Sequence, residues 1–229
     1  MISAYKIIVA IDGSSSTGKS TLAKALALKL GYGYVDTGAM YRATTLFLIR
    51  HNMDFNNIAA IQKALYAIQI QFRPGKNGNR TFLNGEDVED EIRTMPVSEK
   101  VSEVAAVPLI RRAMVAQQQA MAKERGFVMD GRDIGTVVFK DAELKLFLTA
   151  DQNVRLKRRY DELIARGIEI SEEDVLANLL HRDHIDSTRE DSPLRKASDA
   201  IELDNTNLTQ EEQLEIAYQY AMERIKQTA

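Results

Sequence analysis

The first fifty residues alternate between strand-like and helix-like patterns of apolar positions. Tyr5–Ile11 is a run rich in β-branched residues, which is typical of a buried parallel strand. Lys19–Leu30 carries apolar residues at helical spacing, and Gly31 predicts the end of that helix. A short strand at Tyr34–Val35, a turn at residues 36–38 and a helix to about residue 49 follow. Strand, glycine-rich loop, helix and strand in this order predict a doubly wound α/β fold, in which helices flank a central parallel sheet.

The pattern changes after a short predicted helix at Ile58–Ala67. Ile68–Phe72 alternates with period two, Gly75–Asn79 is a cluster of turn residues, and Thr81–Leu83 leads into the hairpin signal Asn84-Gly85. Antiparallel hairpins do not belong inside a parallel sheet. We therefore expect residues 64–100 to form a small inserted antiparallel β-subdomain, with residues 1–63 and 101–229 forming the core.

The second half of the chain returns to alternating helices and strands. Two Ser/Thr-led sequences, at Ser171 and Thr209, resemble capping boxes and predict the start of two further helices. The other elements we expect are helices at Pro108–Glu124 and Asp151–Arg166, and strands at Phe127–Met129, Leu144–Leu148 and Ala200–Leu203.

Composition narrows the class of protein. The 229 residues have a formal net charge of −3 and a sequence pI of about 5.7, so no overall positive field favours nucleic acid, and bound anions need local basic clusters. The absence of cysteine excludes disulfides and thiolate metal sites and fits a reducing compartment. The early apolar run Ile7–Ile11 is too short for a signal peptide or a membrane span. We expect a cytoplasmic protein with no nucleic-acid or membrane partner.

The strongest motif lies directly between the first strand and the first helix. It matches G-x-x-x-x-G-K-[ST] at every fixed position, and its context predicts a phosphate-binding loop (P-loop) for a nucleoside triphosphate. Lys19 is expected at the β- and γ-phosphates, and the Ser20 hydroxyl is suited to bind Mg²⁺. The residues expected to bind ATP are Gly13, Ser14, Ser15, Ser16, Thr17, Gly18, Lys19, Ser20 and Thr21.

Three further segments combine arginines with carboxylates or hydroxyls, a combination suited to phosphate. Asp36–Arg42 and Asp130–Thr136 each follow a predicted strand, at the carboxyl edge where α/β proteins bind ligands. In Arg182–Arg189 the charged residues Arg182, Asp186 and Arg189 recur at i, i+4 and i+7, which would align them on one helix face.

These strings, D-T-G-A-M-Y-R and D-G-R-D-I-G-T above all, resemble bacterial cytidylate kinases, of the nucleoside monophosphate kinase group within the P-loop family. The resemblance covers nearly the whole chain, including the inserted hairpin. It differs at Ser14–Thr17, where relatives often have proline and smaller residues, but backbone groups do the binding there. It implies a P-loop kinase core with a helical lid at about residues 153–170.

The resemblance also implies roles for individual residues. It places Thr37, Arg42, Arg132 and Arg189 at the CMP phosphate, Arg182 and Asp186 at the ribose, Ser102, Arg111 and Asp133 at the cytosine edge, Arg155, Arg158 and Arg159 in the lid, and Asp130 between the acceptor phosphate and the metal region. The residues expected to be catalytic are Lys19, Asp130, Arg132, Arg155, Arg158 and Arg159. Asp183 fits a solvated helical charge, and the three histidines lack metal-ligand spacing.

The expected activity is transfer of the γ-phosphoryl group of ATP to CMP or dCMP, with Mg²⁺ as the cofactor and a monomeric enzyme. Positioning and electrostatic stabilisation carry phosphoryl transfer, so no essential general base is expected. A UMP/CMP kinase of broader specificity is the alternative within the enzyme class. A regulatory GTPase would need a guanine-reading motif such as N-K-x-D, which this sequence lacks.

Overall fold

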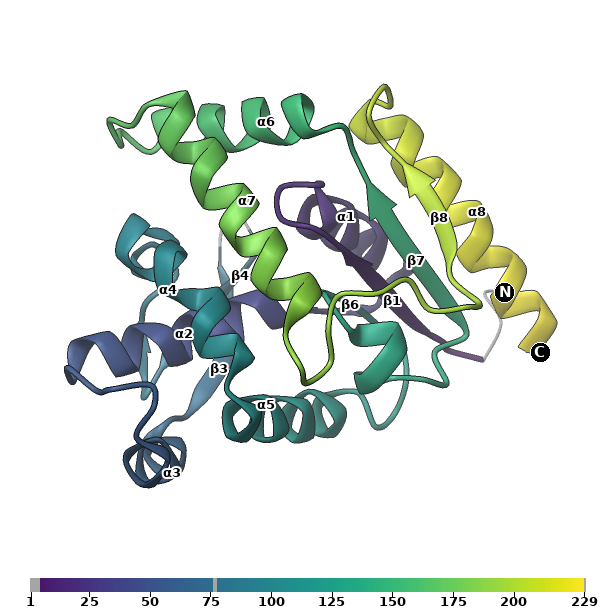
Figure 1. Cartoon of the computed structure of the whole chain (residues 1–229). Helices are drawn as coiled ribbons and strands as arrows, with labels where there is room; N and C mark the ends of the chain where they lie inside the picture. Colours follow the sequence, from purple (N-terminus) through teal and green to yellow (C-terminus); the bar gives the residue numbers. More distant parts are fainter. Residues whose placement is uncertain (1–4, 76–77, 229) are drawn as a thin grey trace. The chain divides into compact units, whose positions relative to one another are not determined.

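A computed structural model describes residues 5–75 and 78–228, which divide into two compact units (Figure 1). Unit 1 contains the described residues up to Val35, then Ala122–Thr188, and those from Ser192 onward. Unit 2 contains Asp36–Met121 and Arg189–Asp191.

Unit 1 is built on a five-stranded sheet with the order β2-β6-β1-β7-β8. The central strand β1 (Ile8–Gly13) pairs in parallel with β6 (Phe127–Gly131) on one side and β7 (Leu144–Thr149) on the other. β2 (Gly33–Asp36) and β8 (Ile201–Asp204) form the edges. Every residue of β1 is buried, which explains its continuous apolar run. The predicted parallel sheet is confirmed.

Helices cover the sheet of unit 1. α1 (Lys19–Leu30) and α8 (Gln210–Thr228) pack side by side against it, and their apolar faces share one core with β1, β6, β7 and β8 (Figure 1). Ala23 of α1 and Ala217 and Ala221 of α8 have no exposed surface in that core. The other helical elements of unit 1 are α6 (Gln152–Ala165), α7 (Glu172–Thr188) and a π-helical turn (Ile134–Val138).

Unit 2 combines helices with a three-stranded antiparallel sheet, β3-β4-β5. Leu83 pairs with Glu86 in an antiparallel register across Asn84-Gly85, which confirms the predicted hairpin. Gly75 pairs with Gly78, and Lys76 and Asn77 of the predicted turn cluster lie outside the described residues. The region expected as an insert, residues 64–100, lies within this unit. Its elements are α2 (Thr37–Arg50), α3 (Ile58–Ala67), β3 (Ile70–Gly75), β4 (Gly78–Leu83), β5 (Glu86–Asp87), a 3₁₀ turn (Glu91–Arg93), α4 (Met95–Ala106) and α5 (Pro108–Met121).

Two predictions about unit 2 were wrong. No turn separates β2 from α2, because the Asp36 side chain accepts a hydrogen bond from Ala39 N at 2.8 Å and caps a helix that begins at Thr37. The sequence analysis also missed α4, which has a proline in its first turn and buries Val97, Val101 and Val104.

Both predicted helix starts are confirmed, and the capping box at Thr209 has both of its hydrogen bonds. Thr209 Oγ1 accepts from Glu212 N at 3.1 Å, while Glu212 Oε2 accepts from Thr209 N at 2.9 Å. Ser171 Oγ likewise accepts from Asp174 N at 3.1 Å and opens α7. In contrast, α7 ends at Thr188, so Arg189 does not continue the helix face of Arg182 and Asp186.

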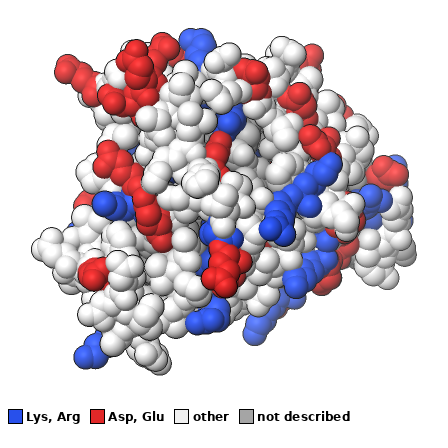
Figure 2. All heavy atoms as spheres, in the orientation of Figure 1, with Lys and Arg blue, Asp and Glu red and all other residues white. Residues whose placement is uncertain are grey.

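Surface charge is mixed. On the face drawn in Figure 2, acidic and basic side chains are interspersed among uncharged ones, in keeping with a net charge of −3. Within residues 5–75 and 78–228, we find no helix with the length and apolar character to cross a bilayer.

Candidate active site

The predicted phosphate loop joins β1 to α1 and depends on two glycines. A Cβ on Gly13 would lie 2.3 Å from the carbonyl oxygen of Leu148 on β7, so a side chain cannot fit there. Gly18 has φ 87° at the N-cap of α1, a conformation that L side chains rarely adopt. The loop therefore delivers backbone N–H groups to the N-terminus of a helix, which is the arrangement that binds phosphate.

Lys19 is the first residue of α1 and is only 5% exposed. Its ammonium donates to the Ser14 carbonyl and, at 3.3 Å, to Thr17 Oγ1. Burial and nearby Arg132 hold the pKa of Lys19 well below its ordinary value, although Asp130, Asp12 and Asp186 favour its charge. The neighbouring carboxylates therefore do not fully balance the positive charge of Lys19, and an anion bound beside it would stabilise that charge.

Ser20, the second residue of α1, and Asp130, near the carboxyl end of β6, form an oxygen-rich pair. Ser20 Oγ donates to Asp130 Oδ2 at 2.7 Å, and Tyr34 Oη donates to Asp130 Oδ1 at 2.8 Å. A hydroxyl oriented by a carboxylate fits Mg²⁺, which prefers hard oxygen ligands and keeps waters and substrate phosphates in its shell. The described residues contain no cluster of three His, Cys, Asp or Glu side chains suited to a metal.

Arg132 and Asp186 form an ion pair close to this loop. Arg132 Nε donates to Asp186 Oδ2 at 2.8 Å, and the Asp186 side chain is 5% exposed. Burial opposes the charge of Arg132, but Asp186, Asp183 and Asp130 outweigh it and raise the arginine's pKa. α7 places Arg182, which is 6% exposed, one turn before Asp186. Arg132, Arg182 and Asp186 thus lie together. The other two predicted acceptor-side residues of unit 1 are Asp133, which directly follows Arg132, and Asp130, the partner of Ser20; each is 4% exposed.

Two of the three predicted lid arginines reach the phosphate loop from α6. Arg155 Nη1 donates to the Ser15 carbonyl at 3.2 Å, and Arg158 Nη1 donates to the Thr17 carbonyl at 3.4 Å. Arg159 instead pairs with Glu162 one turn along the same helix, at 2.8 Å.

The sequence analysis missed Asp183. Its carboxylate accepts from Ser15 N at 3.3 Å and pairs with Arg155, so it is not a solvated helical charge. It occupies a backbone N–H that the phosphate loop would offer to an anion. Its position within the predicted phosphate-binding segment Arg182–Arg189 was the sequence feature that could have indicated a site residue.

Asn205 was missed as well, and it lies just past β8 with no exposed surface. Its Nδ2 donates to the Thr17 carbonyl at 2.7 Å and to Gln213 Oε1 at 2.8 Å. Its Oδ1 accepts from Arg158 at 3.0 Å. Asn205 therefore supports both the phosphate loop and a lid arginine. The available signal was its position at the carboxyl end of a parallel strand.

Unit 2 carries the remaining predicted residues, at its α2, α4 and α5 helices and its short C-terminal segment. Their side chains are largely withdrawn from solvent: Thr37 is 2% exposed, Ser102 2%, Arg111 1% and Arg189 8%. Arg111 donates to the Ala105 carbonyl at 3.3 Å and lies 3.7 Å from Asp191. Polar and cationic groups buried to this degree are typical of binding sites.

Asp36 links the start of α2 to two arginines. Burial acts against its charge, but Arg42 and Arg93, together with the Ala39 N–H, hold its pKa below the ordinary value. Arg93 Nη2 lies 3.2 Å from Asp36 Oδ2. The carboxylate therefore stays ionised and orients the first turn of α2, which carries Thr37; Arg42 lies in the next turn.

The fold and the phosphate loop define a P-loop protein of the kinase type, with a cationic cluster beside the loop. A model of the cytidylate kinase family matches residues 9–223. The chain is 57% identical to a cytidylate kinase of Parabacteroides distasonis over 91% of its length and 93% of the relative's. It is 56% identical to a cytidylate kinase of Bacteroides thetaiotaomicron over 92% of this chain and 94% of the relative. It is also 56% identical to a cytidylate kinase of Cytophaga hutchinsonii over 92% of this chain and 91% of the relative. The chain belongs to the cytidylate kinase family, and it is an enzyme.

Proposed function

We propose that this enzyme transfers the γ-phosphoryl group of ATP to CMP and dCMP, giving ADP and the corresponding diphosphate. The observation that carries the proposal is the buried Lys19 ammonium in the phosphate loop with Arg132 beside it. Two positive charges at one loop suit a reaction that brings two phosphate groups together, because they offset the repulsion between the anions. Family membership and the names of the relatives support cytidylate as the acceptor.

The loop residues Gly13–Thr21 would bind ATP, with backbone N–H groups and Lys19 at its β- and γ-phosphates. Ser20 would hold Mg²⁺, with Asp130 orienting the hydroxyl through its 2.7 Å hydrogen bond. When bound, the ion neutralises charge on the phosphate oxygens. Arg155 and Arg158, which contact the loop's carbonyls, would close over the phosphates and exclude water, and Arg159 would move with them.

For the acceptor we propose the roles that the resemblance implies. Arg42, Arg132 and Arg189 bind the CMP phosphate, with Thr37 nearby; Arg182 and Asp186 bind the ribose; and Ser102, Arg111 and Asp133 read the base. Residues 64–100 act as the acceptor-binding insert. We also propose that the enzyme acts as a monomer in the cytoplasm, which sedimentation and cell fractionation would test.

Discrimination against uracil follows from hydrogen-bond polarity. Cytosine presents a 4-amino donor that a carboxylate can accept, and acceptors at N3 and O2 that arginine can bind. Uracil reverses the groups at positions 3 and 4. Each mispaired buried polar group costs on the order of 1–3 kcal/mol, so UMP should be poorer by roughly one to three decades in kcat/KM.

A coupled assay of ADP formation with CMP, dCMP, UMP and AMP at saturating ATP tests this proposal. We expect turnover with CMP and dCMP and the stated deficit for UMP. Equal kcat/KM for CMP and UMP would favour a UMP/CMP kinase of broader specificity. Preference for AMP would contradict the proposed acceptor.

A further inference from the structure

Asp12 is the one acidic residue of β1, and it bridges this strand to the segment that follows β6. Its Oδ1 accepts from Ile134 N and its Oδ2 accepts from Gly135 N, both at 2.8 Å. Asp12 is 4% exposed, and along the sheet it lies opposite Gly131, the last residue of β6. The carboxylate therefore spans the loop that contains Arg132 and Asp133 and binds its far end.

The bound segment is the π-helical turn Ile134–Val138, an unusual conformation that needs support from outside. The first N–H groups of a helix have no partner within it, and the Asp12 carboxylate satisfies two of them. Inside the turn, Phe139 N donates to the Ile134 carbonyl at 2.7 Å. The Asp12 side chain thus determines where the turn begins and where the preceding residues lie.

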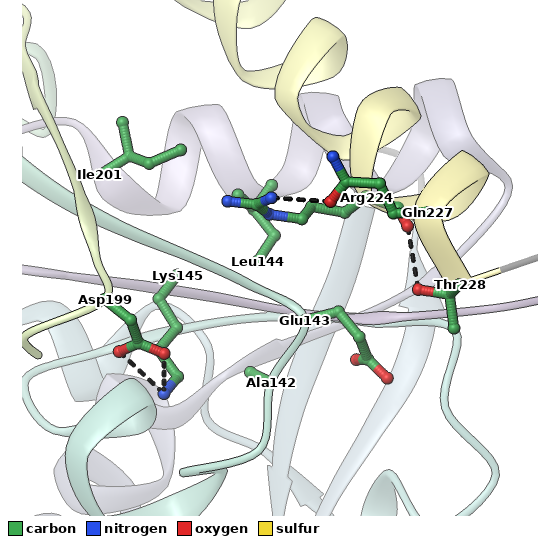
Figure 3. A pocket seen from close by; sticks show the side chains of 9 residues that line it. All are labelled: Ala142, Glu143, Leu144, Lys145, Asp199, Ile201, Arg224, Gln227 and Thr228. Carbon is green, nitrogen blue, oxygen red and sulfur yellow. Dashed lines mark hydrogen bonds and ion pairs between the residues drawn. The ribbon is translucent and has the colours of Figure 1, made fainter.

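Lys145 of β7 packs against the same turn. A Cβ on Gly135 would lie 3.1 Å from Lys145 Cδ and 3.4 Å from Asp12 Oδ2, so both side chains press on this glycine. The Lys145 ammonium donates to the Lys140 carbonyl at 2.6 Å and to both Asp199 oxygens at 3.0 and 2.8 Å (Figure 3). Because Lys145 already has these partners, it supports the turn through its alkyl chain, and Asp12 is the side chain that binds the turn's N–H groups.

We propose that Asp12 is a positioning residue for phosphoryl transfer: by fixing the N-terminus of the turn at Ile134 and Gly135, it holds Arg132 against Asp186 beside the phosphate loop. This rests on the proposed function in so far as Arg132 is taken to bind the acceptor phosphate. Asp12 acts through Arg132 and the turn.

The protonation state of Asp12 gives the proposal a distinctive readout. Burial raises its pKa from 3.8 to about 7; the Gly135 and Ile134 N–H groups and Lys19 oppose that rise, and Asp133 adds to it. Lys145, whose alkyl chain lies against Gly135, is the charged residue facing the turn from β7. A protonated Asp12 would place an O–H donor against an N–H donor and lose one of the two hydrogen bonds. Asp12 should therefore position the turn and Arg132 less firmly as the pH falls below about 7.

The stability contributed by this group changes with pH in the opposite direction. The folded state holds the Asp12 proton more tightly than the unfolded chain, so the cost of burying the charge is absent below about pH 4 and fully present above about pH 7. Acidification from pH 8 to pH 6 should thus relieve this cost while it lowers turnover. A merely structural role predicts that turnover does not fall over this pH range, because the contribution of Asp12 to stability increases there.

The variant Asp12→Asn keeps the shape but offers one acceptor oxygen instead of two. Loss of a hydrogen bond to a charged group predicts a kcat lower by about tenfold to a hundredfold, with KM for ATP within about twofold. Wild-type kcat should fall between pH 8 and pH 6 relative to that of Asp12→Asn, and the difference in Tm between the two proteins should shift in favour of wild type over the same range.

Glu143→Gln is the matched control. Glu143 Oε2 also accepts a backbone N–H of β1, that of Ile8 at 2.9 Å, at the opposite end of the strand. Its replacement should leave kcat and the pH profile unchanged. If both variants lose kcat in proportion to their loss of Tm, Asp12 is a structural residue and the proposal is wrong. Wild-type kcat in Asp12→Asn would overturn it as well.

A measurement on the wild-type protein needs neither a stable variant nor an identified acceptor. The amide resonances of Ile134 and Gly135 should titrate together with a midpoint near pH 7, as the Asp12 carboxylate gains its proton. Amides that show no titration at any pH at which the protein stays folded would refute the two hydrogen bonds to an ionisable Asp12. Titrating amides in a protein that fails to phosphorylate CMP would count against the proposed function and leave the Asp12 contact standing.

Discussion

Asn205 joins the phosphate loop, α8 and a lid arginine through one side chain. The change Asn205→Ala removes the hydrogen bonds to the Thr17 carbonyl, Gln213 and Arg158 at 2.7, 2.8 and 3.0 Å. It also leaves the Thr17 carbonyl without this donor in a site where Asn205 has no exposed surface. A net loss of about 1 kcal/mol for each of the three hydrogen bonds gives a destabilisation of about 2–4 kcal/mol.

For a chain of this size, each kcal/mol lowers the Tm by about 2–4 °C, so the expected drop is about 4–16 °C. KM for ATP should rise as well, because the Thr17 carbonyl belongs to the phosphate loop. Thermal unfolding followed by circular dichroism gives the first quantity, and steady-state ATP titration at saturating CMP gives the second.

Two further variants sharpen this prediction. Asn205→Asp keeps the acceptor for Arg158 and loses both donors, so it should be destabilised while retaining more kcat than Asn205→Ala. Asn57→Ala removes an exposed asparagine that caps α3 through Ala60 N at 3.0 Å, and should cost about 0.5–2 kcal/mol with no change in KM. If Asn205→Ala unfolds no earlier than Asn57→Ala and has an unchanged KM for ATP, the reasoning fails.

Three other predictions concern the proposed substrate contacts. Replacing Arg155, Arg158 and Arg159 with glutamine should lower kcat more than it weakens equilibrium CMP binding; a variant that loses CMP affinity and keeps kcat would contradict the lid role. Asp133→Asn should narrow the ratio of kcat/KM for CMP to that for UMP, and an unchanged ratio would mean that Asp133 does not read the base. Asp183→Asn should lower KM for ATP by about twofold to fivefold, since it removes a partly exposed anion from the Ser15 N–H; a raised KM in ATP titrations would show that Asp183 supports ATP binding instead.

The elements that could be predicted from the sequence are those determined by residues close together in the chain. β1 is a continuous apolar run because both its faces are buried, and the loop glycines at Gly13 and Gly18 are required by a close approach and a positive φ. The capping box at Thr209 is equally local, since both of its hydrogen bonds join residues three apart.

Two elements were missed although their signals are local. The D-T-G segment resembles a turn, but Asp36 caps a helix there and is held ionised by Arg42 and Arg93. α4 lacks a side-chain N-cap, and its amphipathic pattern was not recognised.

The missed site residues have distant partners. Asp183 accepts from a residue 168 positions away, and Asn205 donates to one 188 positions away. No spacing rule relates such pairs, because only the packing of α7 and β8 in unit 1 brings them to the loop.

Transfer of label from [γ-³²P]ATP to CMP, with the products separated by chromatography, tests the central claim most directly. The wild-type chain should place the label in CDP, at a rate that depends on CMP. Lys19→Ala should lose at least about a hundredfold of that rate while keeping its fold, the scale of removing one electrostatic contact in the transition state. Label found in inorganic phosphate regardless of CMP, or undiminished transfer by Lys19→Ala, would contradict the account.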